Sequence, residues 1–240
     1  MLSNNKITGI LFDLDGTLRH NSPTFNEVFF KAVELFELAS NIEKRKNSQR
    51  WMHYYWAQSP ELLADMDNFK GHDDLFWINH TRLNLIAYGC STLEADQFSR
   101  PVYEHIRENY FPSDWVAPDV HETLKELEDR GYALAVLSNR RESCALELAE
   151  LELLDYFDFV LVAGEVNSWK PAPEIFLSGL ERLGTAPKST LYIGDNYYAD
   201  VVGAEKAGLV PVLFDPEAVF PDVTCLVIRT IGDLLSLFEE

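Results

Sequence analysis

Two carboxylates stand one residue apart in LFDLDGTLR, residues 11–19, where a short apolar run breaks into a turn. Asp13 and Asp15 are i and i+2 neighbours, which in a strand point the same way about 6.7 Å apart. A third acidic residue, Asp195, follows another apolar run in YIGDN. If the three meet, their repulsion requires a cation. A few hard oxygen ligands favour Mg²⁺, and the lack of histidine in these segments disfavours zinc.

Groups that can bind an anion follow other apolar runs. Ser138 and Asn139 come directly after one run, and Lys170 lies a few residues past another, in WKPAPEIF. A hydroxyl and exposed amides at a strand-to-helix turn can donate to phosphate oxygens, and a lysine can neutralise charge on substrate and nucleophile. The set predicts a cation-assisted site for phosphoryl transfer, in which positioning and charge stabilisation carry most of the catalysis.

The elements that must position these residues are short runs, apolar on both faces, as is typical of buried parallel strands. Strand and helix patterns alternate from residue 119 to the C-terminus, which predicts a doubly wound α/β sheet. Ligands bind beyond the carboxyl ends of such strands, so we expect the polar residues at one edge. The runs are residues 7–12, 132–137, 159–163, 191–193 and 210–214, with a weaker one at 223–228.

Helix-end signals support this order. Asp119 and Glu122 form a capping-box pattern, and Pro173 and Gly184 bracket the next helix. Residues 20–112 instead look helical without a convincing strand and hold more than half of the aromatic residues. We therefore predict an α/β core of residues 1–19 and 113–240, with residues 20–112 inserted as a helical domain.

The bulk composition excludes several classes. The net charge of −19 argues against nonspecific binding to nucleic acid or an anionic membrane. Three widely spaced cysteines predict buried thiols in a reducing compartment. No apolar run approaches the roughly 18 residues of a membrane span, and none resembles a signal peptide. We expect a cytoplasmic protein, and no protein partner is evident.

Four motifs, in order, resemble those of the haloacid dehalogenase (HAD) superfamily of hydrolases. FDLDGT resembles its DxDGT motif, Ser138 its lone Ser/Thr, KPAPEIF its K-P-x-P-x-x-F pattern, and residues 194–208 its closing acidic motif. The resemblance implies a Rossmann-like core with a helical cap over residues 20–112. The cap cannot follow Ser138, because only 31 residues separate Ser138 from Lys170.

The resemblance also implies roles. Asp13 would be the nucleophile that forms an aspartyl-phosphate, and Asp15 would be the acid and base. Lys170 would stabilise the charge of Asp13 and of the phosphoryl group. Phosphate would be held by Thr17, Ser138 and the backbone of Asn139; Mg²⁺ would be bound by Asp13, the carbonyl of Asp15 and Asp195; and Asp200 would act through water or Lys170.

An acid at Asp15 favours phosphate-ester cleavage over dehalogenation, since halide needs no proton donor. We expect a phosphatase with a helical cap, acting on a small phosphorylated metabolite. A sugar phosphomutase with the same site, or a non-catalytic binding protein on the same fold, stays an alternative. Arg19, His20 and Asn21 stand where many relatives carry an apolar residue followed by Asp-Ser, and we expect Arg19 and His20 to contact substrate. The aromatic residues of WMHYYW, residues 51–56, are predicted to be core. His53, His72, His80 and His105 are predicted to be structural or surface residues.

Overall fold

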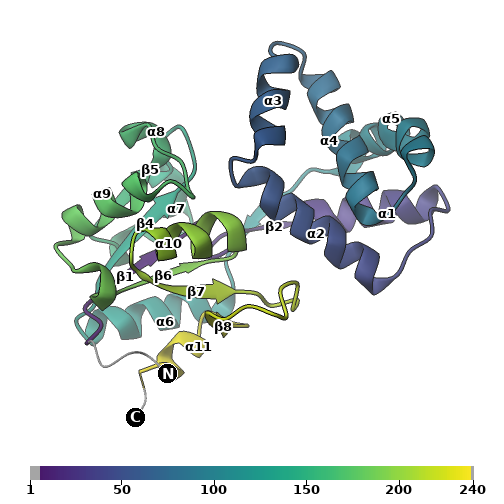
Figure 1. Ribbon diagram of the computed structural model, residues 1–240. Coiled ribbons are helices and arrows are strands. Elements are labelled where there is room, and N and C mark those ends of the chain that lie inside the picture. Colours follow the sequence, from purple (N-terminus) through teal and green to yellow (C-terminus); the bar gives the residue numbers. More distant parts are fainter. Residues whose placement is uncertain (1–5, 239–240) are drawn as a thin grey trace. The chain divides into compact units, whose positions relative to one another are not determined.

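The computed structural model describes residues 6–238 and divides into two compact units (Figure 1). One unit runs to His20 and resumes at Trp115, and the other is Asn21–Asp114. The chain passes between them in two short strands, β2 (His20–Ser22) and β3 (Ser113–Trp115), which form a two-stranded sheet. The prediction that residues 20–112 lack strands was wrong at β2, because three partly exposed polar residues leave no hydrophobic pattern.

The first unit is built on six parallel strands in the order β5-β4-β1-β6-β7-β8. This confirms the predicted parallel sheet. The chain runs outward from β1 on one side and from β6 on the other, so the order reverses between these two strands, where ligands of open α/β sheets bind. The strands are β1 (Gly9–Phe12), β4 (Ala133–Ser138), β5 (Phe159–Val162), β6 (Thr190–Gly194), β7 (Val210–Phe214) and β8 (Leu226–Ile228).

Helices cover both faces of this sheet. Successive residues of β1 point to opposite faces: Ile10 and Phe12 belong to one hydrophobic cluster and Leu11 to the other. The first cluster contains residues of α6 (Pro118–Asp129), α7 (Ala145–Glu150) and α11 (Asp233–Ser236). The second contains residues of α9 (Pro173–Leu183) and α10 (Val202–Lys206), and the short α8 (Ala163–Val166) follows β5. The sheet is therefore doubly wound.

The predicted helix ends are right for α9, whereas the predicted start of α6 is wrong. Helix α9 begins at Pro173 and ends before Gly184, whose φ of 70° is left-handed. Helix α6 begins at Pro118 without a side-chain cap, so Asp119 lies inside the first turn and accepts a hydrogen bond from the Gly232 N–H at 2.8 Å. Proline fixes the helix start here, because its ring presets φ and it has no N–H to cap.

The second unit contains, in the described part of the chain, five α-helices with their own core. Helices α1 and α5 both start with a capping box, at Thr24 and Ser91. Helix α4 packs against α2 and α5. The helices are α1 (Phe25–Leu35), α2 (Ile42–Trp56), α3 (Pro60–Asn68), α4 (Asp73–Tyr88) and α5 (Thr92–Asn109). This confirms the predicted helical block; its role as a cap stays a prediction.

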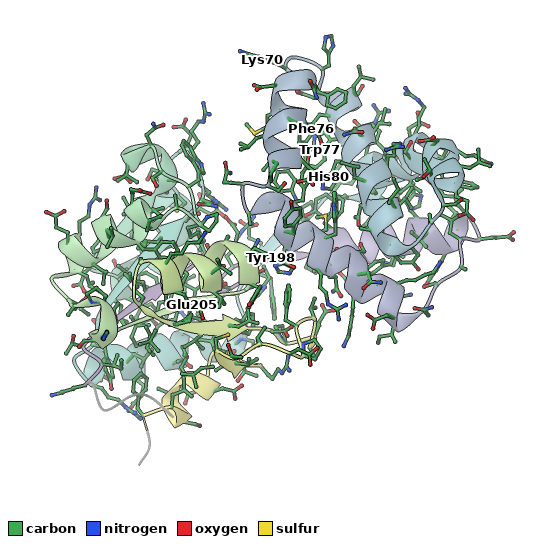
Figure 2. The ribbon with its side chains drawn as sticks, viewed as in Figure 1. Lys70, Phe76, Trp77, His80, Tyr198 and Glu205 are labelled. Carbon is green, nitrogen blue, oxygen red and sulfur yellow. The ribbon has the colours of Figure 1, made fainter. Side chains whose placement is uncertain are left out.

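His80 on α4 is fully buried among aromatic rings of this unit. Figure 2 shows it near Trp77 and Phe76 on the same helix. The ring centroids of Trp51 and Tyr55 lie 5.2 and 4.9 Å from that of His80. Of the WMHYYW segment, Tyr55 is fully buried, whereas Trp56 is exposed. Neither imidazole nitrogen has a hydrogen-bond partner among the described residues, and burial lowers the pKa of His80 to about 3.

The sequence predicts no membrane-spanning segment. Among the described residues, no helix is both long and apolar enough to cross a bilayer.

Candidate active site

Three carboxylates gather where the strand order reverses. Asp13 follows β1 and Asp195 follows β6, its parallel neighbour, and the Asp13 N–H donates to the Ile193 carbonyl at 2.8 Å. Asp200 lies five residues further along the chain. One carboxylate oxygen from each of the three lies within 4.8 Å of those of the other two. We call these three residues the carboxylate triad.

One buried ammonium faces this triad. Lys170 is 2% exposed, and its Nζ donates to Asp13 Oδ1 at 2.5 Å, to Asp200 Oδ1 at 2.7 Å and to the Tyr192 hydroxyl at 2.9 Å. Burial alone would lower the pKa of Lys170, but the facing carboxylates of Asp13 and Asp200 raise it well above its usual value. Lys170 is therefore a permanent cation that joins the nucleophile candidate to Asp200.

The triad is still short of positive charge. Burial raises the pKa of Asp13 to about 7, with Lys170 opposing the rise and Asp200 adding to it. Burial, then the charges of Asp13 and Asp200, raise the pKa of Asp195 well above its usual value. A divalent cation would remove this repulsion, and carboxylate oxygens without nitrogen or sulfur suit a hard ion such as Mg²⁺. The residues present fit the predicted metal.

Local backbone structure brings Asp200 into the triad. It lies in a single π-helical turn, η3 (Tyr197–Val201), which begins after Asn196. The Asn196 side-chain oxygen accepts the N–H groups of Tyr198 and Ala199 at 3.1 and 3.0 Å, and the Asn196 N–H donates to Asp200 Oδ2 at 2.9 Å. Such wide turns recur at functional sites because they re-aim a side chain.

Two glycines leave room for the acidic groups. A Cβ on Gly194 would lie 2.3 Å from Asp200 Oδ2, and a Cβ on Gly16 would lie 2.6 Å from Asp195 Oδ2. Gly16 also has a φ of 91°, which side chains disfavour. Two separate reasons thus favour glycine at this position of DxDGT: the left-handed backbone angle and the nearby Asp195 carboxylate.

The two hydroxyls predicted to bind phosphate lie at the same edge of the sheet. Thr17 Oγ1 accepts the Asp195 N–H at 3.0 Å and lies 3.5 Å from Asp13 Oδ2. Ser138 ends β4, the strand beside β1, and its Oγ accepts the Arg140 N–H at 3.3 Å. Both hydroxyls are almost fully buried.

The side chain of Asn139 holds the backbone of Lys170. Its Oδ1 accepts the Lys170 N–H at 2.7 Å, and its Nδ2 donates to the Lys170 carbonyl at 3.0 Å. This pair of bonds fixes the backbone of the lysine to the end of β4. The sequence suggested only a backbone contribution to phosphate binding, so this clamp is an addition.

Asp15 does not join the triad. Its carboxylate accepts from Arg140 Nε and Nη2 at 2.7 and 2.6 Å and from Arg19 Nη1 at 2.9 Å. The side chain is 39% exposed. The predicted acid and base is thus held in an ion pair beside the triad, and its catalytic role stays a prediction.

The two residues expected to contact substrate have different surroundings. Arg19 reaches Asp15 and also Glu147, whose Oε1 lies 2.9 Å from Arg19 Nε. The His20 ring instead packs against Trp115 and Phe214, with ring centroids 5.4 and 5.9 Å apart. Burial lowers the pKa of His20. Arg19 therefore belongs to the charged surroundings of the site, whereas His20, on β2, belongs to a cluster of aromatic rings.

Sequence reasoning missed three residues at this site. Tyr192 was hidden in an apolar run, although a tyrosine in so short a buried strand needs a partner for its hydroxyl. Its OH donates to the Leu137 carbonyl at 3.2 Å and contacts Lys170. Arg140 could have been noticed, since it directly follows Ser138 and Asn139. Glu147 left no signal in the sequence.

Comparison with known proteins gives concordant relatives. A family model described as haloacid dehalogenase-like hydrolase matches residues 7–208. A ribulose-1,5-bisphosphate 5-phosphatase of Halopiger xanaduensis is 31% identical over 212 residues, covering 87% of this chain and 85% of its own. A pyrophosphatase PpaX of Bacillus cereus is 26% identical over 204 residues, covering 85% of this chain and 81% of its own.

Solved structures agree on the fold. The crystal structure of a HAD phosphatase from Thermococcus onnurineus has a TM-score of 0.59 and 26% identity, covering 97% of this chain and 98% of that one. A predicted phosphoglycolate phosphatase from Haemophilus somnus has a TM-score of 0.61 and 21% identity, covering 98% and 99%. The second likeness concerns the fold alone.

Proposed function

The chain belongs to the haloacid dehalogenase-like hydrolases, and we propose that it is a Mg²⁺-dependent phosphatase that hydrolyses a small phosphorylated metabolite. Its relatives carry names of phosphatases and pyrophosphatases, which supports hydrolysis of phosphoric monoesters. The observation that carries the proposal is the buried Lys170 Nζ held 2.5 Å from Asp13 and 2.7 Å from Asp200. A surface carboxylate would need no such partner.

We propose a reaction in two steps at this edge of the sheet. An oxygen of Asp13 attacks phosphorus and the bond from phosphorus to the ester oxygen breaks. Asp15, having left its ion pair and taken a proton from solvent, gives that proton to the ester oxygen. Water then attacks the aspartyl-phosphate, Asp15 takes its proton, and phosphate leaves with the Asp13 carboxylate restored. Both steps are proposals, and the first requires Asp15 to turn away from its present ion pair.

The other residues bind the phosphoryl group and the metal ion, or neutralise negative charge. Thr17 and Ser138 donate to phosphoryl oxygens, and Lys170 offsets charge on Asp13 and on the phosphoryl group. Asp13, Asp195 and the backbone carbonyl of Asp15 would hold Mg²⁺, with Asp200 placed to act through Lys170 or a bridging water. Bound there, Mg²⁺ would supply positive charge to the transferring phosphoryl group.

The substrate class rests on the relatives and on the second unit. Two relatives have names that denote phosphorylated small molecules, a bisphosphate and pyrophosphate. We propose that residues 21–114 act as a cap that selects the substrate and excludes water. The cytoplasmic location stays a prediction.

Hydrolysis of an aryl phosphate tests this function. With Mg²⁺ present, the protein should release inorganic phosphate, and EDTA or Asp13→Asn should abolish release because the nucleophile or its cation is lost. The matched control is Asp222→Asn, which makes the same chemical change at an exposed residue and should leave the rate unaltered. Undiminished turnover by Asp13→Asn would refute the proposal. An isomerised sugar phosphate without free phosphate would favour the phosphomutase.

A further inference from the structure

Asp15 belongs to a cluster of four charges, all within the first unit, that the proposed reaction does not explain. Arg140 Nε and Nη2 lie 2.7 and 2.6 Å from the two oxygens of Asp15, and Arg19 Nη1 lies 2.9 Å from one of them. Glu147 Oε1 lies 3.0 Å from Arg140 Nη2 and 2.9 Å from Arg19 Nε, and its Oε2 also accepts from Arg140. Each guanidinium therefore touches both carboxylates. We call Arg19 and Arg140 the arginine pair.

The arginine pair flanks the residues proposed to bind the phosphoryl group. Arg19 is two residues from Thr17, in the turn that Asp15 also enters. Arg140 is two residues from Ser138, and its N–H donates to the Ser138 hydroxyl at 3.3 Å. The arginine side chains are 17% and 28% exposed, so solutes can reach them.

The charges of this cluster balance only while Asp15 stays in it. Two guanidiniums face two carboxylates. When Asp15 turns to the leaving oxygen, Glu147 alone is left to neutralise two arginines, which are then partly desolvated and short of one negative charge. Removing one partner from such a network is costly unless another anion replaces it.

We propose that the arginine pair binds a second anionic group of the substrate, which takes the place of Asp15 and frees it for proton transfer. This rests on the proposed function and narrows it to phosphate monoesters whose leaving group carries a carboxylate or a second phosphate. A guanidinium fork fits both groups by paired N–H···O bonds. A neutral leaving group would leave the cationic excess uncompensated.

If the second anion displaces Asp15, the enzyme should prefer anionic esters to neutral ones in kcat as well as in KM. Binding energy from the second anion is used to open the Asp15 ion pair, so it lowers the barrier of the chemical step instead of only tightening the substrate. Glu147 competes with the anion for the same guanidiniums.

Three esters on one two-carbon frame test the proposal: 2-hydroxyethyl phosphate, which is neutral beyond its phosphate, phosphoglycolate, and ethane-1,2-diyl bisphosphate. The wild-type enzyme should prefer at least one anionic member in kcat/KM by about tenfold to a hundredfold, the range expected for a charge-assisted bidentate contact. Which member is favoured identifies the second anion as carboxylate or phosphate. Equal rates on all three would overturn the proposal, whereas no turnover of any ester would overturn the proposed function instead.

Two variants, one that removes a positive charge and one that removes a negative charge, separate anion binding from a merely structural role. Arg140→Gln should reduce the preference ratio about tenfold or more, because it should lower kcat/KM for the anionic esters more than for the neutral ester. Glu147→Gln should lower KM for the anionic esters, because it removes the competing carboxylate. If the cluster only scaffolds the loop, both variants would slow all three esters alike.

The control is Arg141→Gln. Arg141 is exposed and adjacent to Arg140 in the chain, so this variant loses the same charge nearby and should keep the wild-type ratio. A ratio that falls as much in Arg141→Gln as in Arg140→Gln would show a nonspecific charge effect and contradict the proposal. If Arg140→Gln fails to fold, Arg140→Lys keeps the charge without the fork and should still reduce the ratio.

Discussion

At the scale of single residues, Lys170 is the centre of the site. Its ammonium is buried and donates to Asp13, Asp200 and Tyr192. Breaking a buried ion pair by removing one partner costs more than the pair itself contributes, because the remaining charge is uncompensated. The carboxylate triad, already short of positive charge, makes this effect larger.

We therefore expect Lys170→Met to destabilise the metal-free protein by about 3 kcal/mol in free energy of unfolding and to abolish phosphatase activity. Urea unfolding in EDTA measures the first effect. Lys188→Met provides the control, since Lys188 is exposed and its loss should change stability little. A Lys170→Met protein as stable as the wild type would show that the ammonium does not compensate the triad.

At the scale of elements, the turn after β6 decides where Asp200 points. The π-helical turn η3 and the Asn196 N–H together direct its carboxylate toward Lys170. Gly194, the last residue of β6, leaves the space that the Asp200 carboxylate fills. The position of Asp200 in the turn therefore depends on the absence of a side chain at Gly194, at the end of the strand.

Gly194→Ala should displace Asp200, because the new Cβ would lie 2.3 Å from its Oδ2. We expect a loss of about 1–3 kcal/mol in stability, the usual cost of overpacking, together with a lower kcat. Gly232→Ala is the matched control, since the nearest atom to its new Cβ lies at 3.4 Å, an ordinary contact. Equal behaviour of the two variants in thermal unfolding and turnover would contradict this account.

At the scale of the whole molecule, each unit has its own hydrophobic core, and the second also buries His80. Burial lowers the pKa of His80 to about 3 from an ordinary 6.5. Between these values the unfolded chain binds a proton that the folded one does not. The free energy of unfolding therefore falls as the pH falls below about 6.5.

Between pH 7 and pH 5 this residue should cost the protein about 2 kcal/mol of stability. His80→Phe should remove that part of the pH dependence, since phenylalanine does not titrate. Urea unfolding at both pH values measures it, followed by the fluorescence of Trp51, Trp56 and Trp77, which lie in the same unit. If wild type and variant lose equal stability between the two pH values, the imidazole is not held neutral by burial.

Much of the fold could be predicted from the sequence because its signals are local. Buried parallel strands need apolar runs, and each of the six predicted runs contains most or all of a strand. Pro173 and Gly184 mark a helix by their own backbone preferences. The capping box at Asp119 was misleading because a proline one residue earlier set the helix start instead.

The amino-acid sequence by itself determined which polar residues stand at or shortly after strand ends, and hence that Asp13, Ser138, Lys170 and Asp195 would share one edge of a parallel sheet. Only the tertiary structure decided where their side chains point. In the tertiary structure, Asp15 is hydrogen-bonded to Arg140, which lies 125 residues away in the sequence, and Asn139 is hydrogen-bonded to Lys170, which lies 31 residues away. Such contacts depend on strand order and on turns that aim each side chain, and a local pattern of residue types carries neither.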